Sequence, residues 1–166
     1  MLPQASTISS MRLCDILSSE RILIDPEGEL IHAKADALRL LSELLAPAVG
    51  AERSDVEDLL AERERLQSTG IGDGVAIPHS SLDSAERQAA ALLLVPGGVD
   101  FDAIDGGSVR IIFGVVGPKR ATGEHLRTLA RISRLLRDEQ TRAKLLDSKS
   151  PASAYELIQD HEAAAR

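Results

Sequence analysis

The chain has 166 residues, of which 43% are hydrophobic and only 2% aromatic, and its formal net charge is −7. This length suits one domain whose core is filled by leucine, valine, isoleucine and alanine. The acidic balance and the scarcity of aromatic rings for base stacking exclude a typical nucleic-acid-binding protein. The first ten residues lack the pattern of a signal peptide, and no apolar stretch is long enough for membrane insertion. We therefore expect a cytoplasmic protein.

The predicted elements alternate between helices and strands. Residues 1–10 are polar and are expected to form a flexible tail before a domain over residues 11–162. Lone Cys14 excludes an internal disulfide and is expected to be a buried hydrophobe of the first helix. Hydrophobic periodicity and turn residues predict, in chain order, a helix at 11–17, a strand at 21–24, a helix from 35 that Pro47 ends, a helix at 55–67, strands at 75–78, 89–95 and 109–116, and helices at 124–136, 137–146 and 151–159.

Two of these strands are continuous apolar runs, which is typical of strands covered on both faces. Three helix starts have cap signals: a capping box of Ser54 and Glu57, Thr122 as an N-cap, and Ser150 followed by proline. No repeat or interdomain linker interrupts the pattern. The sequence therefore predicts one α/β domain.

A glycine-rich segment at residues 68–79 leads to a histidine. Its glycines allow main-chain amides to approach an anion, and two hydroxyls precede them. The following apolar residues predict a short strand that places His79 at its carboxyl end, where open α/β sheets hold ligands. We interpret the segment as a phosphate-binding loop beside a nucleophile, with candidate phosphate-binding residues Ser68, Thr69, Gly70, Gly72, Gly74 and Ser80.

Two further side chains fit this interpretation. Arg63 falls within the apolar stripe of the preceding helix, so it either pairs with a carboxylate at the core edge or reaches the cavity beside His79, where a guanidinium would neutralise a phosphoryl group. His125 lies in the first turn of a later helix, whose positive end disfavours imidazole protonation and favours a nearby anion. Without the glycine segment, His125 would be an ordinary half-buried histidine.

Four elements in order resemble the enzyme IIA domain of the fructose/mannitol/nitrogen class of the phosphotransferase system, that is, the EIIA type-2 domain. They are Arg63, the segment at 68–79, the segment at 101–106 and the segment at 125–129. The resemblance covers about residues 15–159. It implies a mixed β-sheet with helices on both faces, phosphorylation of His79 at Nε2, and a pocket lined by His125 and Arg63.

The resemblance also implies a function without a cofactor. His79 would accept a phosphoryl group from an HPr-like phosphohistidine carrier, and the chain would act as a stand-alone, nitrogen-class regulatory IIA. Alternatively, it passes phosphate to a cysteine of a IIB domain for sugar uptake, or it is an interaction module that is not phosphorylated. Many nitrogen-class relatives follow the histidine with glycine and a basic residue, whereas this chain has Ser80 and Ser81.

A metalloenzyme is the remaining alternative from another class. The two histidines and an aspartate, Asp73 or Asp105, could supply three ligands. However, the sequence has neither a His-Glu-x-x-His motif nor paired cysteines, and a metal would leave the glycine segment unexplained. We therefore expect no metal.

Overall fold

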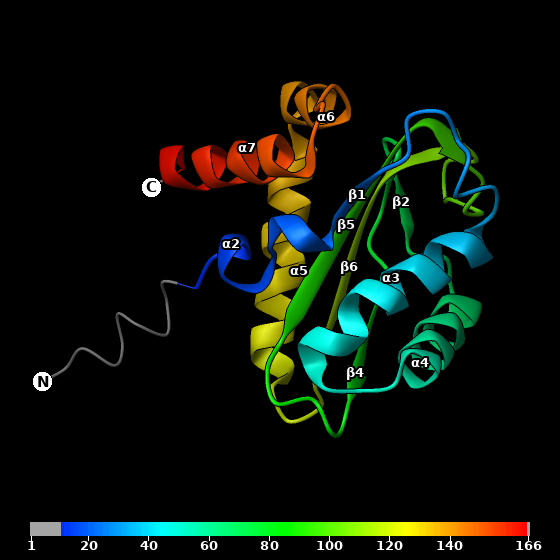
Figure 1. Cartoon of the computed structure of the whole chain (residues 1–166), viewed down its shortest axis with the longest axis vertical. Helices are drawn as coiled ribbons and strands as arrows, with labels where there is room; N and C mark the ends of the chain where they lie inside the picture. The colour runs from blue at the N-terminus through cyan, green and yellow to red at the C-terminus, as the bar shows by residue number, and fades with distance from the viewer. Residues whose placement is uncertain (1–10, 166) are drawn as a thin grey trace, which may run out of the picture.

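The computed structural model describes residues 11–165, and Figure 1 shows them as one domain with a central sheet between helical layers. The expected tail at residues 1–10 lies outside the described part of the chain. The described elements are α2 (Leu13–Ile16), the 3-10 helix η1 (Ser19–Arg21), β1 (Ile22–Ile24), α3 (Lys34–Val49), α4 (Arg53–Leu66), β2 (Gly70–Gly72), β3 (Val75–Ala76), β4 (His79–Leu82), β5 (Ala89–Val99), β6 (Val109–Pro118), α5 (Thr122–Arg137), α6 (Glu139–Leu146) and α7 (Pro151–Ala164).

The six strands found in residues 11–165 form one mixed sheet in the order β1-β5-β6-β3-β2, with β4 also paired to β6. β5 and β6 are antiparallel, as are β2 and β3. β1 runs parallel to β5, and both β3 and β4 run parallel to β6. The prediction of a single α/β domain with a mixed sheet is confirmed.

Each face of the sheet has its own hydrophobic core. Because side chains alternate along a strand, Ala91 and Leu93 of β5 pack toward α3 and α4, whereas Leu92 and Leu94 pack toward α2, α5, α6 and α7. Figure 1 shows the same division, with α3 and α4 on one side of the sheet and α5 on the other. The apolar run of β5 is therefore two interleaved faces, as the sequence predicted for a strand covered on both sides.

A glycine in β6 allows α3 to approach the sheet closely. A Cβ atom built on Gly114 would lie 2.8 Å from Cδ2 of Leu41 and 3.0 Å from its Cδ1, which is closer than carbon atoms normally pack. Leu41 itself is fully buried. The missing side chain at Gly114 therefore sets the distance between α3 and the strand on which the site is built.

Two predicted elements, the helix that begins at 35 and the strand at 89–95, continue past a proline instead of ending before it. α3 continues through Pro47 to Val49 and ends at Gly50, which has φ 71°. Proline in the last turn removes one helical hydrogen bond, and the buried side chains of Ala46 and Val49 keep that turn on the core. β5 likewise continues past Pro96 to Val99, because the ladder is irregular between Leu94 and Val99 and the proline needs no donor there.

The cap predictions have mixed outcomes. α4 begins one residue before Ser54, with Glu52 as its N-cap residue and no side-chain cap hydrogen bond, so the predicted capping box is wrong. Ala121, rather than Thr122, is the N-cap residue of α5. Ser150 is confirmed, since its side chain accepts a hydrogen bond from the N–H of Ser153 at the start of α7.

The two ends of the described chain are joined by a carboxylate. Glu162 in α7 accepts hydrogen bonds from the N–H of Leu13 at 2.7 Å and the N–H of Cys14 at 3.1 Å. It also accepts one from Cys14 Sγ at 2.9 Å, and Tyr155 donates its hydroxyl to the Cys14 carbonyl. Cys14 is half-buried, not fully buried as expected, and burial together with the bond to Glu162 raises its thiol pKa to about 12.

Candidate functional site

His79 opens β4, whereas the sequence placed it at the end of the strand before. β3 stops at Ala76, and residues 77–78 carry the chain to β4, which pairs His79 with Val115 of β6. The bend occurs because proline offers no N–H to a sheet ladder. The carbonyl of Pro78 still accepts a hydrogen bond from the N–H of Val115 at 3.0 Å. The backbone of His79 is therefore fixed by β6 on a rigid part of the sheet.

The imidazole of His79 is held in one tautomer. Its Nδ1 lies 2.7 Å from the carbonyl oxygen of Ile77, and because a carbonyl only accepts, Nδ1 carries the proton. Nε2 then keeps its lone pair. Burial lowers the pKa of His79 below its usual value, and the positive charge of Arg63 lowers it further. The hydrogen bond to Ile77 and the negative charge of Glu64 act in the opposite direction and are outweighed. The net result is a neutral ring at neutral pH.

His125 lies beside His79. The two ring centroids are 5.6 Å apart and the ring planes are tilted by 49°. Burial lowers the pKa of His125 as well, and the neighbouring His79 lowers it further. Its Nδ1 is buried and has no hydrogen-bond partner in the described part of the chain, which costs free energy unless another group satisfies it. The ring stands in the first turn of the 16-residue helix α5, whose N-terminal end favours an anion.

Arg63 is half-buried near the C-terminal end of α4 and approaches the same place. Its Nη1 donates a hydrogen bond to the carbonyl of Gln67 at 3.0 Å, and its charge is close enough to act on the pKa of His79. The sequence also predicts Leu66 in the apolar stripe of this helix, and this part is wrong, because Leu66 is 80% exposed and Glu64 is buried in its place. The structure nevertheless brings together His79, His125 and Arg63.

The glycine segment does not surround His79. Residues 70–76 form a β-hairpin of β2 and β3, and its turn residues Asp73 and Gly74 have φ values of 59° and 77°. The carbonyl of Gly74 accepts hydrogen bonds from the N–H groups of Arg110 and Ile111, whereas His79 pairs with Val115. Four to five residues along β6 correspond to about 13–16 Å.

Gly72, Gly74 and Asp73 therefore lie toward the far end of the sheet from the imidazole. Gly70 has a packing role, since a Cβ atom there would lie 2.9 Å from Cβ of Ala103. These glycines turn the hairpin and admit the neighbouring loop, which corrects the interpretation of a phosphate cradle. They are close to His79 in the sequence but not in the structure, because β3 carries the chain away from the hairpin turn.

Two of the three predicted hydroxyl ligands already form hydrogen bonds within the fold. Ser68 donates its hydroxyl to the Phe101 carbonyl at 2.5 Å, and Thr69 donates its hydroxyl to Glu64 Oε1 at 2.6 Å. Thr69 is only 4% exposed. Both hydroxyls thus hold the chain between α4 and β3. Ser80 differs, because it follows His79 on half-buried β4 and its hydroxyl has no hydrogen-bond partner among residues 11–165.

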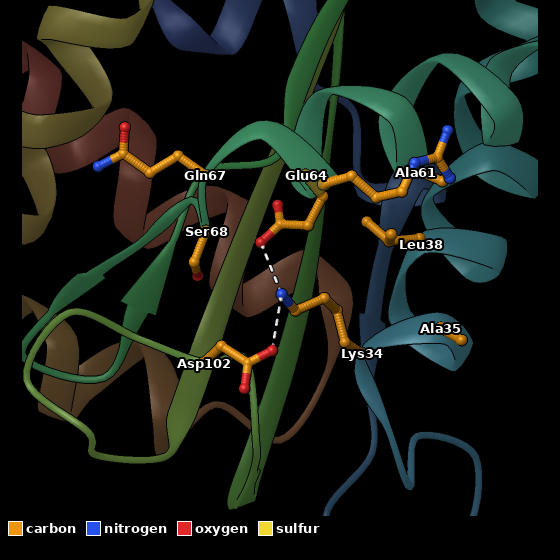
Figure 2. Close-up of a pocket in the computed structure, with 9 residues that line it drawn as sticks. Lys34, Ala35, Leu38, Ala61, Glu64, Gln67, Ser68 and Asp102 are labelled. Carbon is orange, nitrogen blue, oxygen red and sulfur yellow. Dashed lines mark ion pairs between the residues drawn. The ribbon is translucent and has the colours of Figure 1, made fainter.

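Sequence reasoning missed the charged residues behind the site. Glu64 is 6% exposed and forms an ion pair with Lys34, and both line a pocket of about 440 Å³ (Figure 2). The signal for Glu64 was present, since Val56, Leu60 and Glu64 repeat at four-residue spacing on one helix face. Lys34 begins α3, and only the tertiary fold brings it to Glu64.

Residues 11–165 contain no group of three histidine, cysteine, aspartate or glutamate residues arranged to hold a metal ion. No helix in this range combines the length and the apolar character needed to span a bilayer.

Comparison with known proteins defines the class. Residues 15–161 match the family described as phosphoenolpyruvate-dependent sugar phosphotransferase system, EIIA 2. The chain therefore belongs to the EIIA type-2 family of the phosphotransferase system, as the sequence resemblance predicted, and family membership supports a phosphotransfer role.

The chain is similar to nitrogen regulatory proteins in sequence and structure, and to a mannitol enzyme IIA in fold. A nitrogen regulatory protein from Bradyrhizobium diazoefficiens is 33% identical over 148 residues, which cover 89% of this chain and 95% of the relative. The crystal structure of nitrogen regulatory protein IIA-Ntr from Neisseria meningitidis superposes with a TM-score of 0.82 at 31% identity, covering 88% of this chain and 98% of that one. The mannitol enzyme IIA of Escherichia coli, in its complex with phosphorylated enzyme IIB, shares the fold with a TM-score of 0.71 at 23% identity, covering 86% of this chain and 96% of that chain.

Proposed function

We propose that this chain is a stand-alone regulatory IIA of the nitrogen class and that His79 accepts a phosphoryl group at Nε2. The donor is a phosphohistidine on an HPr-like carrier protein. The observation that carries the proposal is the hydrogen bond from His79 Nδ1 to the Ile77 carbonyl, which leaves Nε2 as the nucleophilic atom of a neutral ring. The similarity to nitrogen regulatory proteins over nearly their full length supports the regulatory role.

Phosphoryl transfer to His79 exchanges one P–N bond for another. The P–N bond of the donor breaks as a bond forms between phosphorus and His79 Nε2, and the electron pair of the broken bond returns to the donor imidazole. The Nδ1 proton of His79 stays on its bond to Ile77. The transition state is loose and anionic, so the protein contributes positioning and positive potential. Arg63 and the N-terminal end of α5 supply this potential, and the ring of His125 offers a hydrogen bond to a phosphoryl oxygen.

The test is intact-mass measurement after incubation with enzyme I, an HPr-like carrier and phosphoenolpyruvate. The wild-type chain should gain one labile phosphoryl group, and His79→Ala should gain none because the acceptor atom is missing. Arg63→Gln or His125→Ala should still be phosphorylated, about 10²- to 10³-fold more slowly, as when one electrostatic donor is lost. His32→Ala is the matched control, because His32 is exposed. A phosphoryl group on His79→Ala would refute the assignment.

The route of phosphate after His79 decides between regulation and sugar uptake. A regulatory IIA should stay phosphorylated when mixed with IIB domains and should bind other proteins according to its phosphorylation state. Rapid, complete transfer to a IIB cysteine would instead assign the chain to sugar uptake. A wild-type chain that gains no phosphoryl group would indicate an interaction module that is not phosphorylated.

A further inference from the structure

A buried carboxylate lies behind the proposed nucleophile, and phosphoryl acceptance does not by itself explain it. Glu64 comes from the same helix as Arg63 but points into the core, with its side chain 4% exposed. Burying a carboxylate is unfavourable unless charges and hydrogen bonds compensate it. The groups that bind the Glu64 carboxylate therefore indicate its structural role.

Three groups converge on the Glu64 carboxylate. Oε1 accepts the hydroxyl of Thr69 at 2.6 Å, and Oε2 accepts the N–H of Thr69 at 3.0 Å. Lys34 Nζ lies 3.0 Å from Oε2 and 3.4 Å from Asp102 Oδ2, as Figure 2 shows. The Lys34 ammonium also lies 5.3 Å from the centre of the Phe101 ring, a cation–π distance. Glu64 thus fixes both the backbone and the side chain of Thr69.

Thr69 passes this constraint to His79 through backbone hydrogen bonds. The carbonyl of Thr69 accepts the N–H of Ile77 at 3.0 Å, and the carbonyl of Ile77 accepts Nδ1–H of His79 at 2.7 Å. The charged carboxylate is therefore linked to the imidazole through two residues, Thr69 and Ile77. Moving Thr69 would move the acceptor that sets the tautomer of His79.

We propose that Glu64 is a positioning residue for phosphoryl transfer: through Thr69 it holds the Ile77 carbonyl that keeps the proton of His79 on Nδ1 and directs Nε2 outward. This role rests on the proposed function of His79. Glu64 also acts through its charge. Within residues 11–165, two charges of α4 act on the pKa of His79, the positive Arg63 and the negative Glu64, and the titratable ring of His125 from α5 lies beside it.

The test compares Glu64→Gln with Glu62→Gln, an exposed position on the same helix. Nitrogen NMR of the unphosphorylated protein reports the tautomer and pKa of His79, and single-turnover phosphorylation reports the rate. Glu64→Gln should populate the Nε2–H tautomer, lower the pKa of His79 because a negative charge is lost, and slow phosphorylation about 10- to 100-fold, as expected for a misplaced reacting group. Glu62→Gln should change none of these.

Thr69→Val and Thr69→Ser provide a second comparison if Glu64→Gln does not fold. Valine removes the hydroxyl that bonds Glu64 and should shift the tautomer of His79, whereas serine restores that hydroxyl and should restore the tautomer. A folded Glu64→Gln protein with wild-type tautomer, pKa and rate would overturn the positioning role. So would an unshifted tautomer in Thr69→Val. A wild-type chain that takes up no phosphoryl group would overturn the proposed function instead, while the NMR measurements would still show whether Glu64 controls the ring.

Discussion

Replacing Glu162 with alanine should destabilise the fold by separating its two ends. The substitution removes three hydrogen bonds to one carboxylate and leaves the N–H groups of Leu13 and Cys14 without that acceptor. A hydrogen bond to a charged acceptor contributes about 1.5–3 kcal/mol, and water can replace part of it at this half-buried position. We therefore expect the free energy of unfolding to fall by about 2–3 kcal/mol. Urea denaturation followed by circular dichroism measures this change.

The thiol of Cys14 gives an independent measurement of the same contact. Burial and the bond to Glu162 raise its pKa to about 12, so the wild-type thiol should react slowly with iodoacetamide at mildly alkaline pH. Glu162→Ala should react faster, because the negative neighbour is gone. Glu156→Ala is the control, since Glu156 is exposed on the same helix. If Glu162→Ala matched this control within ~0.5 kcal/mol and its thiol reacted no faster, the reasoning would be refuted.

Two other predictions concern the sheet and the site. Gly114→Ala should lower the free energy of unfolding by about 1–3 kcal/mol, because the added methyl group pushes against Leu41. Gly97→Ala is the control and should lower it much less, because a methyl group there meets open space. Equal urea midpoints for the two variants would contradict this packing argument. Because burial lowers the pKa of both His79 and His125, the unfolded chain takes up protons first as the pH falls through about 6.5, the ordinary histidine pKa. The free energy of unfolding should therefore decline as the pH falls from neutral through this value. The decline should be shallower in His125→Gln, and an equally steep decline there would rule out a contribution from that ring.

The sequence predicted the fold well because its strongest signals were periodic. Apolar runs gave β5 and β6, and helical spacing gave α3, α5 and α7, while boundaries moved where packing outweighed a local rule, as at Pro47 and Pro96. The convergence of His79, Arg63 and His125 was also anticipated. It followed from the helix stripe, the helix start and the family resemblance together.

The position of the glycine hairpin and the buried carboxylate could not be predicted in the same way. Glycines beside a histidine in sequence suggested a cradle, but the hairpin turn lies on the far part of β6, and this register depends on long-range pairing. The hydroxyls of Ser68 and Thr69 found acceptors within the fold. Glu64 was missed because a glutamate in a charged helix is normally exposed. Its ion-pair partner Lys34 lies 30 residues earlier in the sequence, so no local pattern joins the two.

The parallel pairing of β4 with β6 determines when His79 can acquire its environment during synthesis. A nascent chain that has emerged only through residue 108 contains the histidine but lacks the whole of residues 109–118, the strand that orders its backbone. Pairing β4 with β6, which are far apart in the sequence, is slow compared with forming a local helix. Maturation of the histidine environment should therefore wait for the second half of the polypeptide, and fragments that end before Val109 should lack it.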